Sequence, residues 1–202
     1  RDWSSDVCSS DLGLPMALPG MTAGADVALV PIVSSARAAR LIKKNWSRKH
    51  HRVPDAFVFE SAFAGGYLGY KATQVETGRE QIYRIILELK EEAGALPLIA
   101  GGGIMNRKDA IRAYTYGADG IQLGSCFIPT VECDASAAFK ETYLNLQEND
   151  VTIIENPQGM PCQVIDNPFV QNLTTRITPE EERTALIRAA DQIGRASCRE
   201  RV

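Results

Sequence analysis

The sequence predicts an α/β fold and, within that class, about the C-terminal half of a (β/α)8 TIM barrel. Along the 202 residues, short apolar runs alternate with segments of helical periodicity. Two consecutive apolar runs, 96–100 and 120–123, end in glycine at the spacing of one strand–helix unit. An open doubly wound sheet also fits this alternation. The paired glycine ends favour the barrel, because barrels bind phosphate after their last two strands.

Each element follows from its local pattern. Residues 56–59 are apolar throughout, as in a parallel strand buried on both faces. Residues 78–93 carry one apolar stripe that includes Ile82 and Leu89, which is typical of a helix. The segment 151–169 is predicted to leave the barrel after its last strand, and the sequence assigns it no role. The predicted order is strand 27–33, helix 36–46, strand 56–59, helix 78–93, strand 96–100, helix 106–116, strand 120–123, helix 134–147 and a helix from about residue 179.

The two ends of the chain differ from the rest. Residues 2–12 show neither helical nor strand periodicity, and residues 193–202 interrupt a good helical pattern. Each resembles one reading frame of the adapter oligonucleotides that are ligated to DNA for sequencing. We therefore expect residues 1–12 and 193–202 to be non-native tails and residues 13–192 to be the partial barrel domain. Two ordinary tails are the alternative.

Composition and charge exclude several classes of protein. A net charge of -3 argues against a nucleic-acid-binding surface, which needs a basic face. No apolar run reaches membrane-spanning length. Outside the tails Cys126, Cys133 and Cys162 remain, an odd number without zinc-type spacing, so we expect a reduced cytoplasmic protein without disulfides. Both histidines, His50 and His51, lie in a basic run apart from carboxylates and cysteines, so no metal site is predicted.

The glycine-ended strands predict a binding site for a phosphorylated cofactor. Gly101, Gly102 and Gly103 follow the first strand, and Gly124 and Ser125 follow the second. Glycine lets backbone N–H groups approach an anion closely, and a helix that starts there adds partial positive charge.

In their order along the chain, several motifs resemble the nitronate monooxygenase family, formerly called 2-nitropropane dioxygenases. The resemblance implies an FMN-dependent (β/α)8 barrel that oxidises alkyl nitronates with molecular oxygen to a carbonyl compound and nitrite. Flavin-dependent enoyl-acyl-carrier-protein reductases share the Ala-Gly-Gly loop and both phosphate loops. The matching segments are 13–15, 31–35, Glu60, 64–66, 100–104, 120–125, 132–136 and 159–161.

Carried over by position, the resemblance implies a set of cofactor contacts. The backbone N–H groups of Gly102, Gly103 and Gly124, with the N–H and hydroxyl of Ser125, would bind the FMN phosphate beside Gly101. Family members usually have threonine where this chain has Ser125, and serine keeps the hydroxyl.

Four further residues would lie nearer the flavin ring. Gln122 would lie beneath it, although a structural role fits equally well. Ser34, which with Ser35 ends the first strand, would face the cofactor or cap a helix. Gly65 and Gly66 would let the backbone approach flavin and substrate. Glu60 is read as a hydrogen-bonding scaffold rather than a proton carrier.

Tyr67 is the main departure from the family pattern, which has a histidine base after Ala-Gly-Gly. An unperturbed tyrosine has a pKa of about 10, so it is a poor base near neutrality but a usable hydrogen-bond donor. We therefore expect a full-length enzyme that oxidises nitronates, which are already anions, and acts weakly on neutral nitroalkanes. Ser61, where the family usually has glycine, is a second departure.

Two alternatives and several open points remain from the sequence. The alternatives are an enoyl-acyl-carrier-protein reductase-like enzyme and a catalytically silent FMN-binding protein. The expected partners are a small nitronate and O2, without nucleic acid or membrane. The fragment by itself is expected to be inactive, and a homo-oligomer of the full-length protein is left open.

Overall fold

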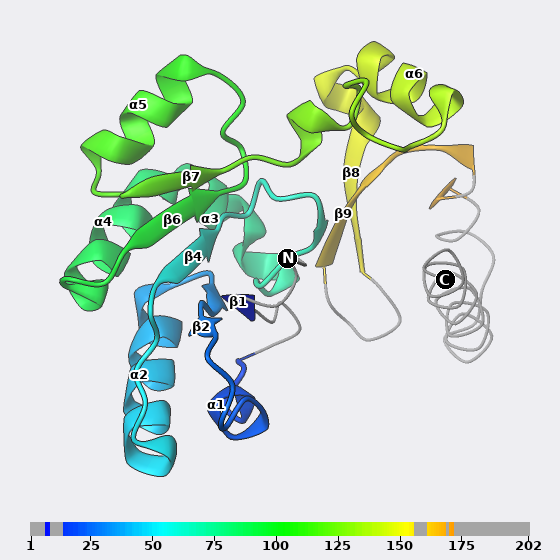
Figure 1. The fold of residues 1–202 in the computed structure, drawn as a ribbon. Helices are drawn as coiled ribbons and strands as arrows, with labels where there is room; N and C mark the ends of the chain where they lie inside the picture. The colour runs from blue at the N-terminus through cyan, green and yellow to red at the C-terminus, as the bar shows by residue number, and fades with distance from the viewer. Residues whose placement is uncertain (1–6, 9–13, 156–160, 169, 172–202) are drawn as a thin grey trace.

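The computed structural model of the chain describes residues 7–8, 14–155, 161–168 and 170–171. The fold has a four-stranded parallel sheet with helices on one face, a three-stranded antiparallel sheet beside it, and a two-stranded sheet, β1-β2 (Figure 1). The strands are β1 Val7–Cys8, β2 Ala28–Leu29, β3 Ile32–Val33, β4 Phe57–Glu60, β5 Gly66–Tyr67, β6 Leu98–Gly101, β7 Gly120–Gln122, β8 Val151–Glu155 and β9 Pro161–Ile165. The α-helices are α1 Leu18–Met21, α2 Ala36–His50, α3 Val75–Glu80, α4 Ile82–Ala93, α5 Arg107–Thr115 and α6 Ala137–Asn145, with 3-10 turns at Ala72–Gln74, Ser125–Phe127 and Glu148–Asp150.

The main sheet has the order β3-β4-β6-β7, and all three of its strand pairs are parallel. The prediction of at least four alternating parallel strands is therefore confirmed. Parallel neighbours need a crossover, and α2 and α4–α5 supply it on one face of the sheet (Figure 1). This α/β arrangement brings the carboxyl ends of the four strands to one edge.

The core lies between that helical layer and the sheet. Ala39, Ile42 and Trp46, which form an apolar stripe along α2, are fully buried. They pack in one cluster with Phe57 and Phe59 of β4 and with apolar residues of α4 and β6. The indole N–H of Trp46 donates to the Pro15 carbonyl at 3.0 Å, so the largest core side chain also satisfies its polar atom.

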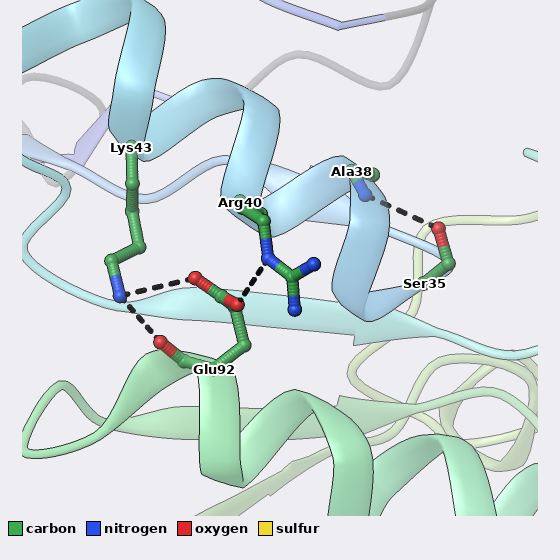
Figure 2. Close-up of polar contacts among 5 residues, drawn as sticks. All are labelled: Ser35, Ala38, Arg40, Lys43 and Glu92. Carbon is green, nitrogen blue, oxygen red and sulfur yellow. Dashed lines mark hydrogen bonds and ion pairs between the residues drawn. The ribbon is translucent and has the colours of Figure 1, made fainter.

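Ion pairs join the helices at the rim of this core. Glu92 of α4 accepts a hydrogen bond from Arg40 Nε at 2.8 Å, and Lys43 Nζ lies 3.4 Å from its other carboxylate oxygen (Figure 2). Lys43 also donates to the Glu92 carbonyl. At the start of α2, Ser35 Oγ accepts from Ala38 N at 3.3 Å, so Ser35 caps this helix.

The single strand predicted over 27–33 is wrong. Two short strands, β2 and β3, occupy it and belong to different sheets. Pro31 has no N–H to continue a ladder. Leu29 instead exchanges hydrogen bonds with Asp55, which accepts from Leu29 N at 2.7 Å and donates its own N–H to the Leu29 carbonyl.

Two other boundaries also differ from the prediction. The helix expected over 78–93 begins at Val75 and is divided at Gln81 into α3 and α4, and no proline marks that break. The excursion expected over 151–169 contains the antiparallel hairpin β8–β9, and β5 pairs with β9 to complete a second sheet of order β5-β9-β8. The helix predicted from about residue 179 lies outside the described residues, as do most residues of the two predicted tails. Of the first tail, Val7–Cys8 pairs with β2.

Candidate functional site

The carboxyl ends of β4, β6 and β7 are aligned in register. Glu60 is the partner of Gly101, and Gly101 is the partner of Gln122. Because strand side chains alternate in direction, these three residues lie on the face opposite to Phe59 and Ala100, which pack into the core under the helices. The loops after β6 and β7 thus start side by side, at the edge where barrels carry their sites.

The loop after β6 is shaped by two consecutive glycines with positive φ, 83° at Gly102 and 70° at Gly103. A Cβ at Gly102 would lie 2.6 Å from Ser61 Oγ and 2.9 Å from Ala64 N, and a Cβ at Gly103 would lie 2.8 Å from Phe63 Cβ. Only glycine therefore combines this conformation with this close approach.

Backbone donors in both loops are left for another acceptor. None of the hydrogen bonds formed among the described residues uses the backbone N–H of Gly102, Gly103 or Ser125. Gly124 and Ser125 are exposed after β7, and Ser125 begins the 3-10 turn. Gln122, the last residue of β7, is also exposed. The predicted phosphate residues are thus brought to one edge with donors that an anion would use.

Ser61 supports this edge in a way that sequence reasoning missed. Its side chain is fully buried, donates to the Gly102 carbonyl at 2.9 Å and accepts from Phe63 N at 3.1 Å. Ala64 N donates to the Ser61 carbonyl at 3.0 Å, which closes a turn over residues 61–64. The only signal in the sequence was that Ser61 stands where the family usually has glycine.

The segment after this turn is fixed to the first strand. Ser34 Oγ donates to the Gly69 carbonyl at 2.7 Å, and Tyr70 Oη donates to the backbone carbonyls of Ser34 and Glu60 at 3.3 and 3.4 Å. Burial, and secondarily the charge of Glu60, raises the pKa of Tyr70, so its phenol stays protonated as a donor. Ser34 thus holds a loop here, and Ser35 forms the helix cap.

Arg79 of α3 and Gln163 of β9 hold the same turn from the other side, and sequence reasoning did not single out either residue. Arg79 Nε donates to the Ala62 carbonyl at 3.2 Å, and its Nη2 donates to Gln163 Oε1 at 2.7 Å. Its guanidinium also lies 5.0 Å from the centroid of the Phe63 ring. Gln163 Nε2 donates to the Phe63 carbonyl at 3.5 Å.

Tyr67 lies on the small antiparallel sheet rather than at the ends of the parallel strands. It pairs with Cys162 across β5 and β9, and its side chain is 50% exposed. Gly65 and Gly66 precede it, both exposed, and a Cβ at either position would meet nothing within 4 Å. The structure therefore presents Tyr67 and these glycines to solvent.

A pocket of about 310 Å³ opens at the carboxyl end of β3. Its lining includes Ser34, Glu60 and Gly69, with Arg37 from the first turn of α2. Of the predicted cofactor residues, Ser34 lines it, whereas the glycine-rich loops lie two and three strands away in the sheet order.

In the part of the chain that the structure describes, no group of three or more His, Cys, Asp or Glu side chains is placed to hold a metal ion. Cys126, Cys133 and Cys162 are free thiols, and burial raises the pKa of Cys162. Within the same residues, no helix has the length and apolar character needed to cross a membrane.

Similar proteins were found by sequence. A (3aS,4S,5R,7aS)-5-hydroxy-7a-methyl-1-oxo-octahydro-1H-indene-4-carboxyl-CoA dehydrogenase of Rhodococcus jostii (strain RHA1) is 26% identical over 149 residues, covering 74% of this chain and 37% of that protein. A probable nitronate monooxygenase of Staphylococcus aureus (strain Newman) is 25% identical over 121 residues, covering 59% of this chain and 34% of that protein.

Solved structures share the fold at lower identity. FabK from Thermotoga maritima superposes with a TM-score of 0.68 at 23% identity, over 83% of this chain and 49% of that one. A nitroalkane oxidase from Streptomyces ansochromogenes gives 0.66 at 21% identity, over 82% and 46%. The chain therefore spans roughly a third to a half of the length of the relatives that it matches. Residues 2–198 match the sequence profile described as nitronate monooxygenase, and the chain belongs to that family of oxidoreductases.

Proposed function

We propose that this chain supplies the phosphate-binding and substrate-facing loops of an FMN-dependent oxidoreductase that oxidises alkyl nitronates with O2, yielding a carbonyl compound and nitrite. The observation that carries the proposal is the pair of glycine-rich loops that leave β6 and β7 side by side, with Gly101 and Gln122 in register. Membership of the nitronate monooxygenase family supports the type of reaction.

The residues present fit the phosphate of FMN. Gly102 and Gly103 pack against residues 61–64 so closely that a Cβ at either position would overlap that turn, which keeps the loop close to it. The N–H groups of Gly102, Gly103 and Ser125 take no part in the hydrogen bonds among the described residues, and the Ser125 hydroxyl adds a further donor. Gly124 is exposed between them and leaves that approach open.

FMN, when bound, supplies the redox chemistry, and the chain supplies position and hydrogen bonds. The N–H groups of both loops would hold the phosphate, and Gln122 and Ser34 would lie along the strand ends nearer the ring. Gly65 and Gly66 would let the backbone approach. Tyr67 would donate a hydrogen bond to the anionic nitronate, whose charge makes a general base unnecessary.

The test is an assay of the full-length protein on one nitroalkane in both of its protonation states. We expect flavin-bound protein to release nitrite and consume O2 with the nitronate, and to act weakly on the neutral form. Ser125→Ala should weaken FMN retention, whereas Ser47→Ala, an exposed position on α2, should not. A protein that binds no flavin would refute the proposal, and equal rates on both substrate forms would refute the role of Tyr67.

A reductase acting on an acyl thioester is the second candidate. It is favoured by the 26% identical relative from Rhodococcus jostii, whose name is that of a carboxyl-CoA dehydrogenase, and by Tyr67 in place of a histidine base. An enoyl-acyl-carrier-protein reductase-like enzyme is the form of this candidate that the sequence suggests. Anaerobic bleaching of the bound flavin by NADH would favour the reductase. Bound flavin without turnover of any of these substrates would favour a silent FMN-binding protein.

The proposal includes the organisation of the chain. Residues 13–192 would form about the C-terminal half of a (β/α)8 barrel, and residues 1–12 and 193–202 would be adapter-derived. Sequencing the native locus with reads that span both ends tests this. Loss of both tails, with upstream coding for about four more strand–helix units, would support it. Tails that persist in the genome would refute it.

A further inference from the structure

Arg79 joins three segments that are distant in the sequence. From α3 it donates to the Ala62 carbonyl at 3.2 Å and to Gln163 Oε1 of β9 at 2.7 Å. Its guanidinium is 5.0 Å from the centroid of the Phe63 ring. The planar guanidinium presents its donors in a fixed fork, so one side chain fixes the turn and the hairpin relative to each other.

Gln163 completes the arrangement from the hairpin. Its Oε1 accepts from Arg79 and its Nε2 donates to the Phe63 carbonyl at 3.5 Å. Gln163 is also the β-sheet partner of Gly66, so its backbone is fixed by the small sheet. Arg79 and Gln163 therefore donate hydrogen bonds to two consecutive backbone carbonyls, those of Ala62 and Phe63.

The turn over residues 61–64 lies directly against the glycine-rich loop that follows β6. Phe63 Cβ and Ala64 N are the atoms that a Cβ at Gly103 or Gly102 would meet, at 2.8 and 2.9 Å. Ser61 N also donates to the Gly101 carbonyl at 3.0 Å. A displacement of the turn must therefore be accommodated by Gly102 and Gly103, because interiors packed this closely transmit strain.

We propose that Arg79 and Gln163 are positioning residues for the phosphate loop: by clamping residues 62–63 they hold Gly102 and Gly103 in the conformation that directs their N–H groups at the cofactor's phosphate. The inference rests on the proposed function. It assigns to α3 and the β8–β9 hairpin a part in cofactor affinity, although neither element supplies a predicted phosphate contact.

The clamp, meaning the hydrogen bonds by which Arg79 and Gln163 hold residues 62–63, can be separated experimentally from an effect of charge. Arg79 forms no ion pair with any of the residues that the structure describes, so its replacement removes a positive charge together with the donors. Gln163 is neutral, and Gln163→Leu removes both of its side-chain hydrogen bonds without changing charge. Gln163→Glu keeps the acceptor for Arg79 but replaces the donor to the Phe63 carbonyl with a second acceptor, so it separates the two hydrogen bonds.

The experiment compares FMN with riboflavin, which lacks the phosphate, by fluorescence titration of the full-length protein. The measured quantity is the ratio of the two dissociation constants. We expect Arg79→Met and Gln163→Leu to lower the preference for FMN by about tenfold while riboflavin affinity changes little. Gln163→Glu, which keeps only the bond to Arg79, should retain part of the preference. The control is Arg84→Met, which removes an exposed arginine of α4 that pairs only locally with Glu88.

Each outcome decides one question. If both variants keep the wild-type FMN preference, or lose affinity for both flavins equally, the clamp is refuted while FMN binding stands. If the wild-type full-length protein binds neither flavin, the proposed function is refuted and the clamp with it. Circular dichroism checks that the variants fold, and if Arg79→Met does not fold, Gln163→Leu carries the test alone.

Discussion

The hydroxyl of Ser61 donates to the carbonyl of Gly102 at 2.9 Å, so a buried side chain just after β4 fixes the backbone just after β6. The same oxygen lies 2.6 Å from the position that a Cβ on Gly102 would take. The bond and the close approach depend on each other, since the carbonyl is within reach only because the glycine lacks a side chain.

Gly102→Ala is expected to lower the free energy of unfolding by about 2–4 kcal/mol. The φ of 83° disfavours any L side chain, and the methyl group would overlap Ser61 Oγ and Ala64 N. Urea unfolding measures the change. Gly65→Ala is the matched control, because a Cβ there meets nothing within 4 Å. Equal losses at the two positions would contradict this account of the loop.

The effects of Gly102→Ala and Ser61→Ala should not add. Ser61→Ala alone should cost about 1–3 kcal/mol, because it leaves the Gly102 carbonyl and the Phe63 N–H without their buried partner. It also removes the atom closest to the added methyl group, so Gly102→Ala should cost less in the Ser61→Ala background. A double-mutant cycle measures the coupling. Additive losses would show that Ala64, rather than Ser61, sets the steric limit.

The ion pair at Glu92 predicts a loss of stability in acid. Burial raises the pKa of this carboxyl group, but hydrogen bonds from Arg40 and Lys43 and their charges outweigh burial and lower it below its ordinary value of 4.5. A pKa that is lower in the folded state stabilises the protein above the unfolded-state pKa, and this stabilisation is lost as pH falls through the folded-state value.

Glu92→Gln should therefore flatten the fall in unfolding free energy between about pH 6 and pH 3. Urea titrations across that range provide the measurement. Glu88→Gln, which removes an exposed pair with Arg84, should follow the wild-type curve, because such surface pairs contribute little. If the Glu92→Gln curve runs parallel to wild type, the interactions of the Glu92 carboxylate with Arg40 and Lys43 do not stabilise the folded state.

Tyr67→His is expected to raise activity on neutral nitroalkanes relative to nitronates in the full-length protein. Histidine has a pKa of about 6.5, so near pH 7.5 it accepts a proton that tyrosine does not. The side chain is half exposed, so the replacement should leave the fold intact. Nitrite release from both substrate forms gives the ratio. Tyr67→Phe is the control and should not raise it, and an unchanged ratio in Tyr67→His would exclude position 67 from proton transfer.

The sequence predicted the parallel sheet from uninterrupted apolar runs such as 57–59. In the structure Phe57 and Phe59 are buried against the helices, whereas Val58, on the other face, is only half-buried. The apolar stripe of α2 was equally predictable from the sequence, since Ala39, Ile42 and Trp46 recur at helical spacing, and all three are buried. The glycines that follow β6 were predictable for a physical reason as well, because the successive positive φ angles at Gly102 and Gly103 favour glycine.

What could not be predicted depends on contacts between distant segments. The strand character of Gly66–Tyr67 comes from its pairing with β9, and no local pattern marks two residues as a strand. In the sequence Arg79 and Gln163 are ordinary polar residues, and only the fold brings them into contact. The division of 27–33 depends on Asp55, whose carboxylate and N–H bind Leu29 from another loop.

The pairing of β5 with β9 also orders events during synthesis. Gln163 and Phe63 are 100 positions apart, and β9 leaves the ribosome after all four strands of the parallel sheet. Since chains fold from the N-terminus as they emerge, the sheet and its glycine-ended loops are able to assemble while the segment around Tyr67 still lacks its neighbour. The parallel sheet is therefore able to form early, whereas the turn at residues 62–63 and the surface that carries Tyr67 take their final form only when the hairpin has been made.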